Sequence, residues 1–452
     1  MESSDALYAF RHSFYECLHP RSDALFELAD AILTADATVP SPVHLSLQAP
    51  YRRGWGSLYA ALDRGGIDAK ALRGLLACHP LALGGTDEPA VFAVDVSVWP
   101  RCDAECSPER GFYYHPSRHS AGQPIVAGWA YQFVAQLNFV RESWTAPVDV
   151  ERVQPAQDAN VVAAEQVGAL LGRLEEETVP LFVFDAGYDP VKLQQGLGRH
   201  PCQMLVRLRA GRRFYGDPSL SDPPANIGRP RRHGPKMKCS DSSTWPEPSA
   251  EHVCQDAGYG AVRVRAWAKM HPKVRNHEGR GSRGPLPLAV GTLILVEVER
   301  LPRGERRRKP RVLWLWWHGP DGLAPDLELI WRSYVRRFDL EHTFRFLKQS
   351  MGWTTPRVRH PEQADRWTWL VLAAYTQLRL ARACVADLRL PWERRYDTGR
   401  LTPIRVHRTV SALLVHLGTP AKPPKPCGRS PRRPKGSLSG RAERYPALKK
   451  SA

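Results

Sequence analysis

The chain has 452 residues, 42% of them apolar, which is enough to bury cores in about two to four domains. Its formal net charge of +18 favours a polyanionic partner, nucleic acid first and an acidic membrane surface second. No apolar stretch approaches the roughly 20 residues that span a bilayer, and the acidic N-terminal segment does not resemble a signal peptide, so we expect a cytoplasmic protein.

Residues 1–85 are predicted to form a helical domain. The segments LYAFRHSFYECL and DALFELADAILTA carry apolar side chains at helical spacing, and GWGSLYAALDRGG follows a break at Pro50. A small helical domain ahead of a basic core either reads DNA or serves as a packing appendage. The sequence leaves both interpretations open.

Residues 86–208 predict an α/β layer. AVFAVDVSVW and PLFVFD are apolar runs typical of strands buried on both faces, and WAYQFVAQLNFV, APVDVERV and QMLVRL indicate further strands. An amphipathic helix is expected over 163–177, where Val167, Leu170, Leu171 and Leu174 share one face. Alternating strands and helices of this kind indicate a mixed sheet flanked by helices.

Residues 209–321 are interpreted as a β-rich insertion. A loop rich in Pro, Gly and basic residues leads to the strand-like segments AVRVRAWAKM, LAVGTLILVEVE and RVLWLWW. The last two are joined by RLPRGERRRKP, which predicts a hairpin with a basic tip. Such a tip is either a clamp for a phosphate backbone or an exposed solubility patch.

Residues 322–390 predict two helices, and residues 391–452 a basic C-terminal region. One long helix is expected over 325–349, with Pro325 in its first turn, and a second over DRWTWLVLAAYTQLRLARACVADL. From Lys422 to Lys450 there are ten basic residues and one acid, Glu443. That composition cannot bury a core, so the last thirty residues are predicted to be a disordered arm.

The nine cysteines form no CxxC pair. Cys102 and Cys106, followed by His115 and His119, are spaced loosely for a zinc site, and Pro116 interrupts the histidine pair. Reduced, unpaired thiols in a reducing compartment are the favoured interpretation.

Two aspartates stand in an unusual context. Asp95 and Asp185 each lie at or near the end of an apolar strand, where a carboxylate is costly to bury unless it is paired or binds a metal. Carboxylates on neighbouring strands suit Mg²⁺ or Mn²⁺, and two such ions support phosphodiester transfer. The alternative is that each aspartate only caps a turn.

A group of polar side chains shares one face of the helix predicted over 325–349. At about 100° per residue, Tyr334, Arg337, Glu341 and Lys348 fall within an arc of about 60°. Glu341 is suited to a metal cluster and the two cations to phosphates. A solvated face with an Arg337–Glu341 salt bridge is the alternative.

The spacing of these four residues resembles the Y-(2)-R-(3)-E-(6)-K signature of a large group of prokaryotic insertion-sequence transposases. The Asp185-Ala-Gly-Tyr188 segment is similar to that group's D-x-G-[Y/F] motif, and Asp95 in AVDVS to its first-aspartate strand. The β-rich stretch fills the gap in which the group carries its insertion. The resemblance implies a ribonuclease-H-like fold in a prokaryotic protein associated with the nucleoid.

The resemblance also implies a function and its residues. Asp95, Asp185 and Glu341 would hold two Mg²⁺ ions, with Mn²⁺ as a substitute, for cleavage of transposon ends and strand transfer into target DNA. Arg337 and Lys348 would clamp phosphates, Tyr334 would contact the terminal nucleotide backbone, and a homodimer would act on paired ends. A metal-dependent nuclease without strand transfer and a non-catalytic DNA-binding protein are the alternatives.

Further DNA contacts are expected in the insertion. Hairpin formation at a DNA end needs a base held on an aromatic ring, for which the tryptophans of the strands are candidates, although a strand tryptophan is more often core. The tryptophans are Trp267, Trp314, Trp316 and Trp317, and the basic tip holds Arg303, Arg306, Arg307, Arg308 and Lys309.

Overall fold

The computed structural model divides the chain into two compact units. Unit 1 comprises Met1–Ala82, Val96–Asp158 and Asp339–Ala452, and unit 2 comprises Leu83–Asp95 and Ala159–Phe338. The structure describes all residues except 1, 36–38, 40, 83–87, 116–121, 140–142, 175–177, 221–231, 275–287, 303–311, 397–399, 427–433, 435, 438–439 and 450–452.

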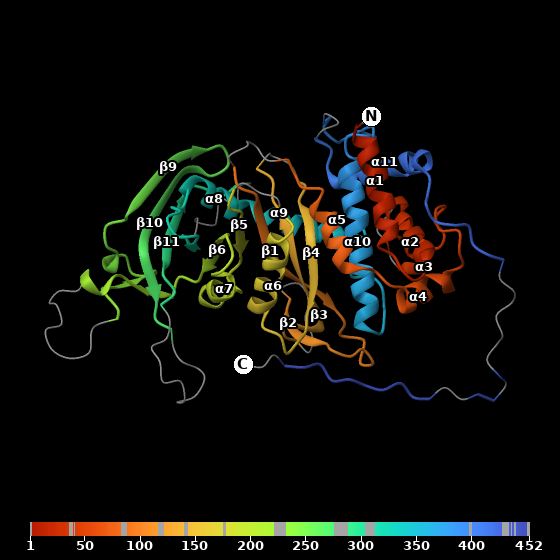
Figure 1. Ribbon diagram of the computed structural model, residues 1–452, viewed down its shortest axis with the longest axis horizontal. Coiled ribbons are helices and arrows are strands. Elements are labelled where there is room, and N and C mark those ends of the chain that lie inside the picture. Colours follow the sequence, from red (N-terminus) through yellow and green to blue (C-terminus); the bar gives the residue numbers. More distant parts are fainter. Residues whose placement is uncertain are drawn as a thin grey trace. The chain divides into compact units, whose positions relative to one another are not determined.

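Helices form most of unit 1 and confirm the helical pattern expected for residues 1–85. The helix α10 is buried along nearly its whole length, as its apolar sequence WLVLAAY predicts, and contacts α1, α2, α4, α5 and α11 (Figure 1). The helices are α1 (Glu2–Glu16), α2 (Ser22–Thr34), α3 (Pro42–Leu45), α4 (Trp55–Arg64), α5 (Ala69–Ala77), α9 (Phe338–Gln349), α10 (Pro361–Ala381) and α11 (Pro403–Leu417).

The strands of unit 1 form an antiparallel layer beside α5 and α10. β3 (Ile125–Gln136) pairs with β2 (Gly111–Tyr114) and β4 (Ala146–Val153), and it also lies next to β1 (Val91–Pro100), whose second half belongs to this unit. Both faces of β3 are buried, since every residue after Ile125 is shielded from solvent. The predicted strands WAYQFVAQLNFV and APVDVERV are thus confirmed.

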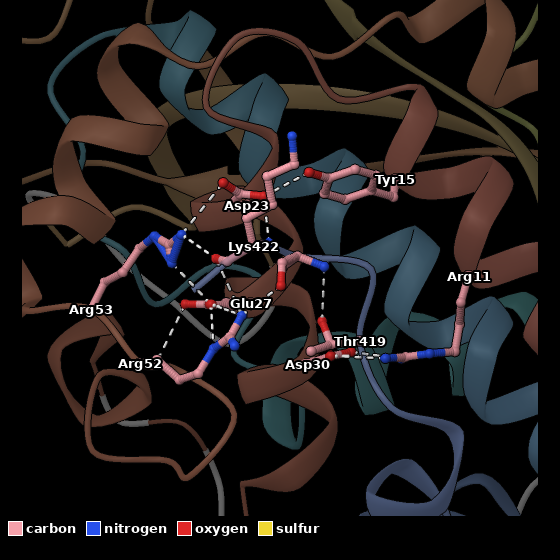
Figure 2. Close-up of polar contacts among 10 residues, drawn as sticks. Arg11, Tyr15, Asp23, Glu27, Asp30, Arg52, Arg53, Thr419 and Lys422 are labelled. Carbon is pink, nitrogen blue, oxygen red and sulfur yellow. Dashed lines mark hydrogen bonds and ion pairs between the residues drawn. The ribbon is translucent and has the colours of Figure 1, made fainter. Parts of the chain in front are cut away.

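A buried ionic network ties the first two helices to the segment that follows α11 (Figure 2). The guanidinium of Arg11 donates to both carboxylate oxygens of Asp30, at 2.7 and 2.9 Å, and to the backbone oxygen of Gly418 at 2.9 Å. Arg52 and Arg53 bond the carboxylate of Glu27, and they also donate to the backbone oxygens of residues 421 and 422. Arginines are therefore structural elements of this core as well as carriers of net charge.

The C-terminal segment differs from the predicted disordered arm in its described residues. The backbone N–H of Lys422 donates to Asp23 at 2.9 Å. Further on, the N–H groups of Tyr445 and Leu448 donate to the backbone oxygens of Glu105 and Arg110, at 2.8 and 2.7 Å. A chain without an apolar core is held here by backbone hydrogen bonds, which composition alone does not reveal.

Unit 2 is built on one mixed sheet. The first half of β1 pairs in parallel with β5 (Leu181–Phe184), and β5 with β6 (Gln203–Leu208). β12 (Leu313–His318) then pairs antiparallel with β6, so the strands of the predicted insertion continue the sheet directly. The remaining strands are β7 (Arg213–Tyr215), β8 (Lys236–Lys238), β9 (Ala250–Asp256), β10 (Gly260–Pro272) and β11 (Gly291–Val298).

The described residues of unit 2 include three α-helices. α6 (Ala159–Leu171) begins four residues before the predicted helix and packs against α7 (Pro190–Leu197), and α8 (Leu327–Arg336) contacts β9 and β10. The long helix predicted over 325–349 is interrupted at Arg337, whose backbone stays α-helical between α8 and α9. Pro325 lies outside the first turn, because Asp326 is the N-cap and accepts from the N–H groups of Glu328 and Leu329.

Within the described residues, none of the helices combines the length and the apolar character that crossing a bilayer requires.

The Arg11–Asp30 pair gives a prediction for stability. Burial raises the pKa of Asp30 and Arg11 opposes this effect, so Arg11→Met would leave a buried carboxylate without its cation and cost about 3–5 kcal/mol at pH 7. Since an acid with a raised folded-state pKa loses stability as the pH rises, the deficit should be smaller at pH 4. Urea unfolding of Arg11→Met and of Arg64→Met, whose side chain is 67% exposed, measures both effects. Equal unfolding free energies for the two variants would contradict the structural role.

Candidate active site

The parallel pairing of β1 with β5 brings the two predicted aspartates together. The register aligns Val94 with Phe184, so Asp95 and Asp185 are the next residues on the two strands. β5 ends at Phe184, whereas β1 continues to Pro100. In a parallel pair, side chains at the same register position lie on neighbouring strands facing the same way. Asp95 and Asp185 therefore both follow the last paired position of two adjacent strands in unit 2.

Tyr188 is close enough to both aspartates for their charges to act on it. Its ring packs edge-on against Phe184, with the ring centroids 5.2 Å apart, and its side chain is buried. Burial, followed by the charges of Asp95 and Asp185, holds the pKa of Tyr188 well above its ordinary value. Arg337 acts in the opposite direction. The phenol thus stays neutral in the site, where it is suited to hydrogen bonding.

Arg337 provides the positive charge next to Asp95. Its Nη1 lies 2.6 Å from the Oδ2 atom of Asp95, and the two side chains are 5% and 15% exposed. A bond of this length between a buried guanidinium and a carboxylate is charge-assisted. The predicted phosphate clamp is thus engaged with the first aspartate of the site.

The D-A-G-Y turn fixes the second aspartate. The Oδ1 atom of Asp185 accepts a hydrogen bond of 2.7 Å from the N–H of Gly187. A Cβ added at residue 187 would lie 2.9 Å from that same oxygen, so glycine lets the backbone approach the carboxylate closely. Asp189 caps α7 by accepting from the N–H groups of Val191 and Lys192.

Tyr334 is in the interior of unit 2, with a side chain 5% exposed. Arg337 lies over its ring at 5.7 Å, and desolvation raises the pKa of Tyr334 while the guanidinium groups of Arg337 and Arg207 oppose the shift. The sequence had suggested that Tyr334 contacts a DNA backbone, but its buried ring is not on a surface where such a contact is possible. Arg207 was not predicted as a site residue, although an arginine in the otherwise apolar strand QMLVRL indicates a functional position.

Glu341 and Lys348 belong to unit 1. Both are half-buried on α9, where Glu341 lies in the first turn and Lys348 in the last. The ammonium of Lys348 lies 5.5 Å from the centre of the Trp353 ring, a cation–π contact. Glu341 follows Arg337 by four residues in the sequence, which is about one helical turn.

The tryptophans proposed for base stacking are core residues of unit 2. Trp267, Trp314, Trp316 and Trp317 are all 5% exposed or less. Trp267 packs on Trp314 with ring centroids 5.7 Å apart, and Trp316 stacks on Phe214 at 5.2 Å. The prediction that these rings stack with a DNA base is therefore wrong, because a base cannot reach rings that are buried in the core. The basic tip, with Arg303, Arg306, Arg307, Arg308 and Lys309, lies outside the described residues.

The comparison with protein families decides the classification. A family described as DDE superfamily endonuclease matches residues 13–273, more than half of the chain, and the matched range includes Asp95 and Asp185.

The chain belongs to the DDE superfamily endonuclease family. The comparison with curated proteins gave no match. Membership in the DDE family implies a nuclease-type enzyme with a DNA substrate, as the net charge of +18 and the acidic pair had suggested.

DDE nuclease domains generally use divalent metals, and the acidic side chains of this protein are suitable ligands for such ions. Asp95 and Asp185 present carboxylate oxygens from adjacent strands, the ligand type that Mg²⁺ and Mn²⁺ prefer. In the part of the chain that the structure describes, three His, Cys, Asp or Glu side chains do not gather as a metal-binding group. Two carboxylates of unit 2 are thus the core of the candidate site.

Replacing Arg337 should destabilise the protein. In Arg337→Gln, the buried Asp95 would lie beside Asp185 without its cation, which should lower the free energy of unfolding at pH 7 by about 3 kcal/mol. Arg332→Gln on the same helix removes an exposed ion pair with Glu328 at 3.5 Å, worth about 0.5 kcal/mol. Chemical denaturation of both variants measures the difference. A cost for Arg337→Gln no larger than that for Arg332→Gln would refute a site held together by this ion pair.

Proposed function

We propose that the protein is a DNA transposase with a ribonuclease-H-like core, in which Asp95, Asp185 and Glu341 form the acidic triad. Hydrolysis of a phosphodiester at a transposon end frees a 3′-hydroxyl, and attack of this hydroxyl on a second phosphodiester joins the end to target DNA. The observation that carries the proposal is the adjacent placement of Asp95 and Asp185 on β1 and β5 in a DDE family member.

Helix geometry supports Glu341 as the third acid. Arg337 keeps α-helical backbone angles, φ −51° and ψ −30°, and α9 follows it directly. Residues four apart on a helix are neighbours on one face. Arg337 is bound to Asp95 at 2.6 Å, and Glu341 follows Arg337 by four residues in the sequence. The Tyr334, Arg337, Glu341 and Lys348 spacing further supports the Y-R-E-K group of insertion-sequence transposases.

The chain's own residues prepare the site for a phosphodiester. When bound by the three carboxylates, two Mg²⁺ or Mn²⁺ ions would supply activation of the attacking oxygen and stabilisation of the leaving one. Arg337 orients Asp95, and the Gly187 N–H orients Asp185. Tyr334 positions Arg337, and Lys348 neutralises a phosphate next to the scissile bond. Two copies, each acting on one transposon end, complete the proposed reaction.

A metal-dependent nuclease without strand transfer is the second candidate. The family description names an endonuclease, which covers cleavage but not joining. The two candidates share the acidic site and differ only in whether the freed 3′-hydroxyl attacks a second DNA molecule. Labelled transposon ends incubated with a target plasmid and Mg²⁺ separate them, because only a transposase yields a joined product.

The proposed catalytic role of Asp185 can be tested with Asp185→Asn, for which Asp189→Asn is the matched control. Asp185→Asn removes a metal-binding charge and should abolish cleavage and joining, with the Kd for the end duplex changed less than about three-fold, since phosphate contacts by cations set that affinity. Asp189→Asn makes the same atom exchange at the N-cap of α7, where asparagine caps as well as aspartate, and should keep wild-type activity. Equal activity of the two variants would exclude the triad, and an inactive wild-type protein would exclude the function.

Gly187 is predicted to set the position of the Asp185 carboxylate. Gly187→Ala places a methyl group 2.9 Å from the Asp185 Oδ1 atom, and shifting a catalytic group by about 1 Å costs on the order of 100-fold in rate. Gly172→Ala, where the nearest heavy atom is 3.8 Å away, is the matched control. Single-turnover cleavage rates of the two variants test this prediction. A Gly187→Ala rate equal to that of the control would show that the turn does not set the carboxylate position.

A further inference from the structure

Unit 1 contains two adjoining cavities lined by arginines. Their volumes are about 500 and 400 Å³, and both are lined by Arg101, Cys102, Asp103 and Arg357. The smaller one is also lined by Arg359 and Arg444. We call the combined space, with Arg101, Arg357, Arg359 and Arg444, the arginine cavity.

Arg101 is an unusual residue of this cavity because it is a buried cation, 6% exposed, with no acid bonded to it among the described residues. Its Nη1 atom donates to the backbone oxygens of Pro356 and Val358, at 3.4 and 2.6 Å, and its guanidinium lies 5.5 Å from the centre of the Trp129 ring. Its Nε–H is buried and meets no acceptor in the described parts of the chain. A donor left in this state favours an added acceptor.

The loop that Arg101 holds presents two more cations. Along residues 356–359 burial alternates, with Pro356 and Val358 buried and Arg357 and Arg359 exposed. Alternation of this kind is typical of an extended backbone, in which every second side chain points the same way. Because the carbonyls of Pro356 and Val358 accept from Arg101, the Arg101 contact fixes the segment from which Arg357 and Arg359 project.

The charges around the cavity do not balance. Burial lowers the pKa of Arg101, Asp103 counters this effect, and Arg110 and Arg357 lower the pKa further by repulsion. The second acid, Glu105, is engaged with Arg444 at 3.1 Å. Four arginines therefore face two acids, and an anion placed among them would relieve the repulsion.

We propose that the arginine cavity of unit 1 binds a phosphate group of the DNA backbone. The proposal rests on the proposed function for its source of phosphate, because a DDE enzyme acts on DNA. Guanidinium groups suit the oxygens of a phosphate through paired N–H donors. Positioning of the duplex by such contacts carries no sequence information.

Binding in EDTA tests the proposal apart from catalysis. The probe is a fluorescent random-sequence duplex, titrated by anisotropy over a salt series. Arg357→Ala/Arg359→Ala should weaken binding at least about five-fold and reduce the slope of log K against log salt by about one to two, because each lost phosphate contact removes about 0.9. The control Arg394→Ala/Arg395→Ala removes two exposed arginines elsewhere on unit 1 and should change affinity less than two-fold.

Two other outcomes overturn the inference. Equal losses for the two double variants would show that only net charge matters. Calorimetric binding of inorganic pyrophosphate that the Arg357→Ala/Arg359→Ala variant loses, together with unchanged DNA affinity, would assign the cavity to a small free anion. Cleavage assays with Mg²⁺ keep the two proposals distinguishable. If the wild-type protein cleaves DNA and the cavity variant binds DNA normally, only the phosphate site is refuted. If the wild-type protein does not cleave DNA but the cavity variant shows the predicted salt effect, only the proposed function is refuted.

Discussion

The parallel register of β1 and β5 sets the central electrostatic constraint of the protein. It brings Asp95 and Asp185 to the same end of two adjacent strands, and the charges of both raise the pKa of the buried Tyr188. The guanidinium of Arg337 counters the charge of Asp95 at 2.6 Å. A divalent cation would counter it in the same way. Arg337 is therefore the cation that balances the charge of Asp95 in this structure.

Arginine has two distinct uses in this chain. In the network of Arg11, Arg52 and Arg53 the guanidinium groups are matched by acids and backbone oxygens, so they contribute to packing and little to the external field. In the arginine cavity the acids are too few, and the excess positive charge is held at a defined place. The formal charge of +18 thus includes arginines of both kinds.

Much of this architecture could be predicted from the sequence, because the buried strands are nearly continuous apolar runs and the motif residues keep characteristic spacings. AVFAVDVSVW and PLFVFD marked β1 and β5, and hence the meeting of Asp95 with Asp185. The contact of Arg337 with Asp95 joins residues 242 positions apart, a pairing that no local pattern encodes. Likewise, Tyr334 was expected to face DNA, since helical spacing gives a shared face but not whether a neighbouring strand covers it.

The docked C-terminal segment also changes what the outer edge of β2 offers to other molecules. Leu448 forms a parallel bridge with Gly111, so part of the strand edge GFYY, which carries the exposed rings of Phe112 and Tyr114, is already occupied. An open edge with aromatic side chains is a template for strand addition by another chain, and a covering segment blocks such aggregation. The segment around Leu448 thus covers the edge of β2 at Gly111.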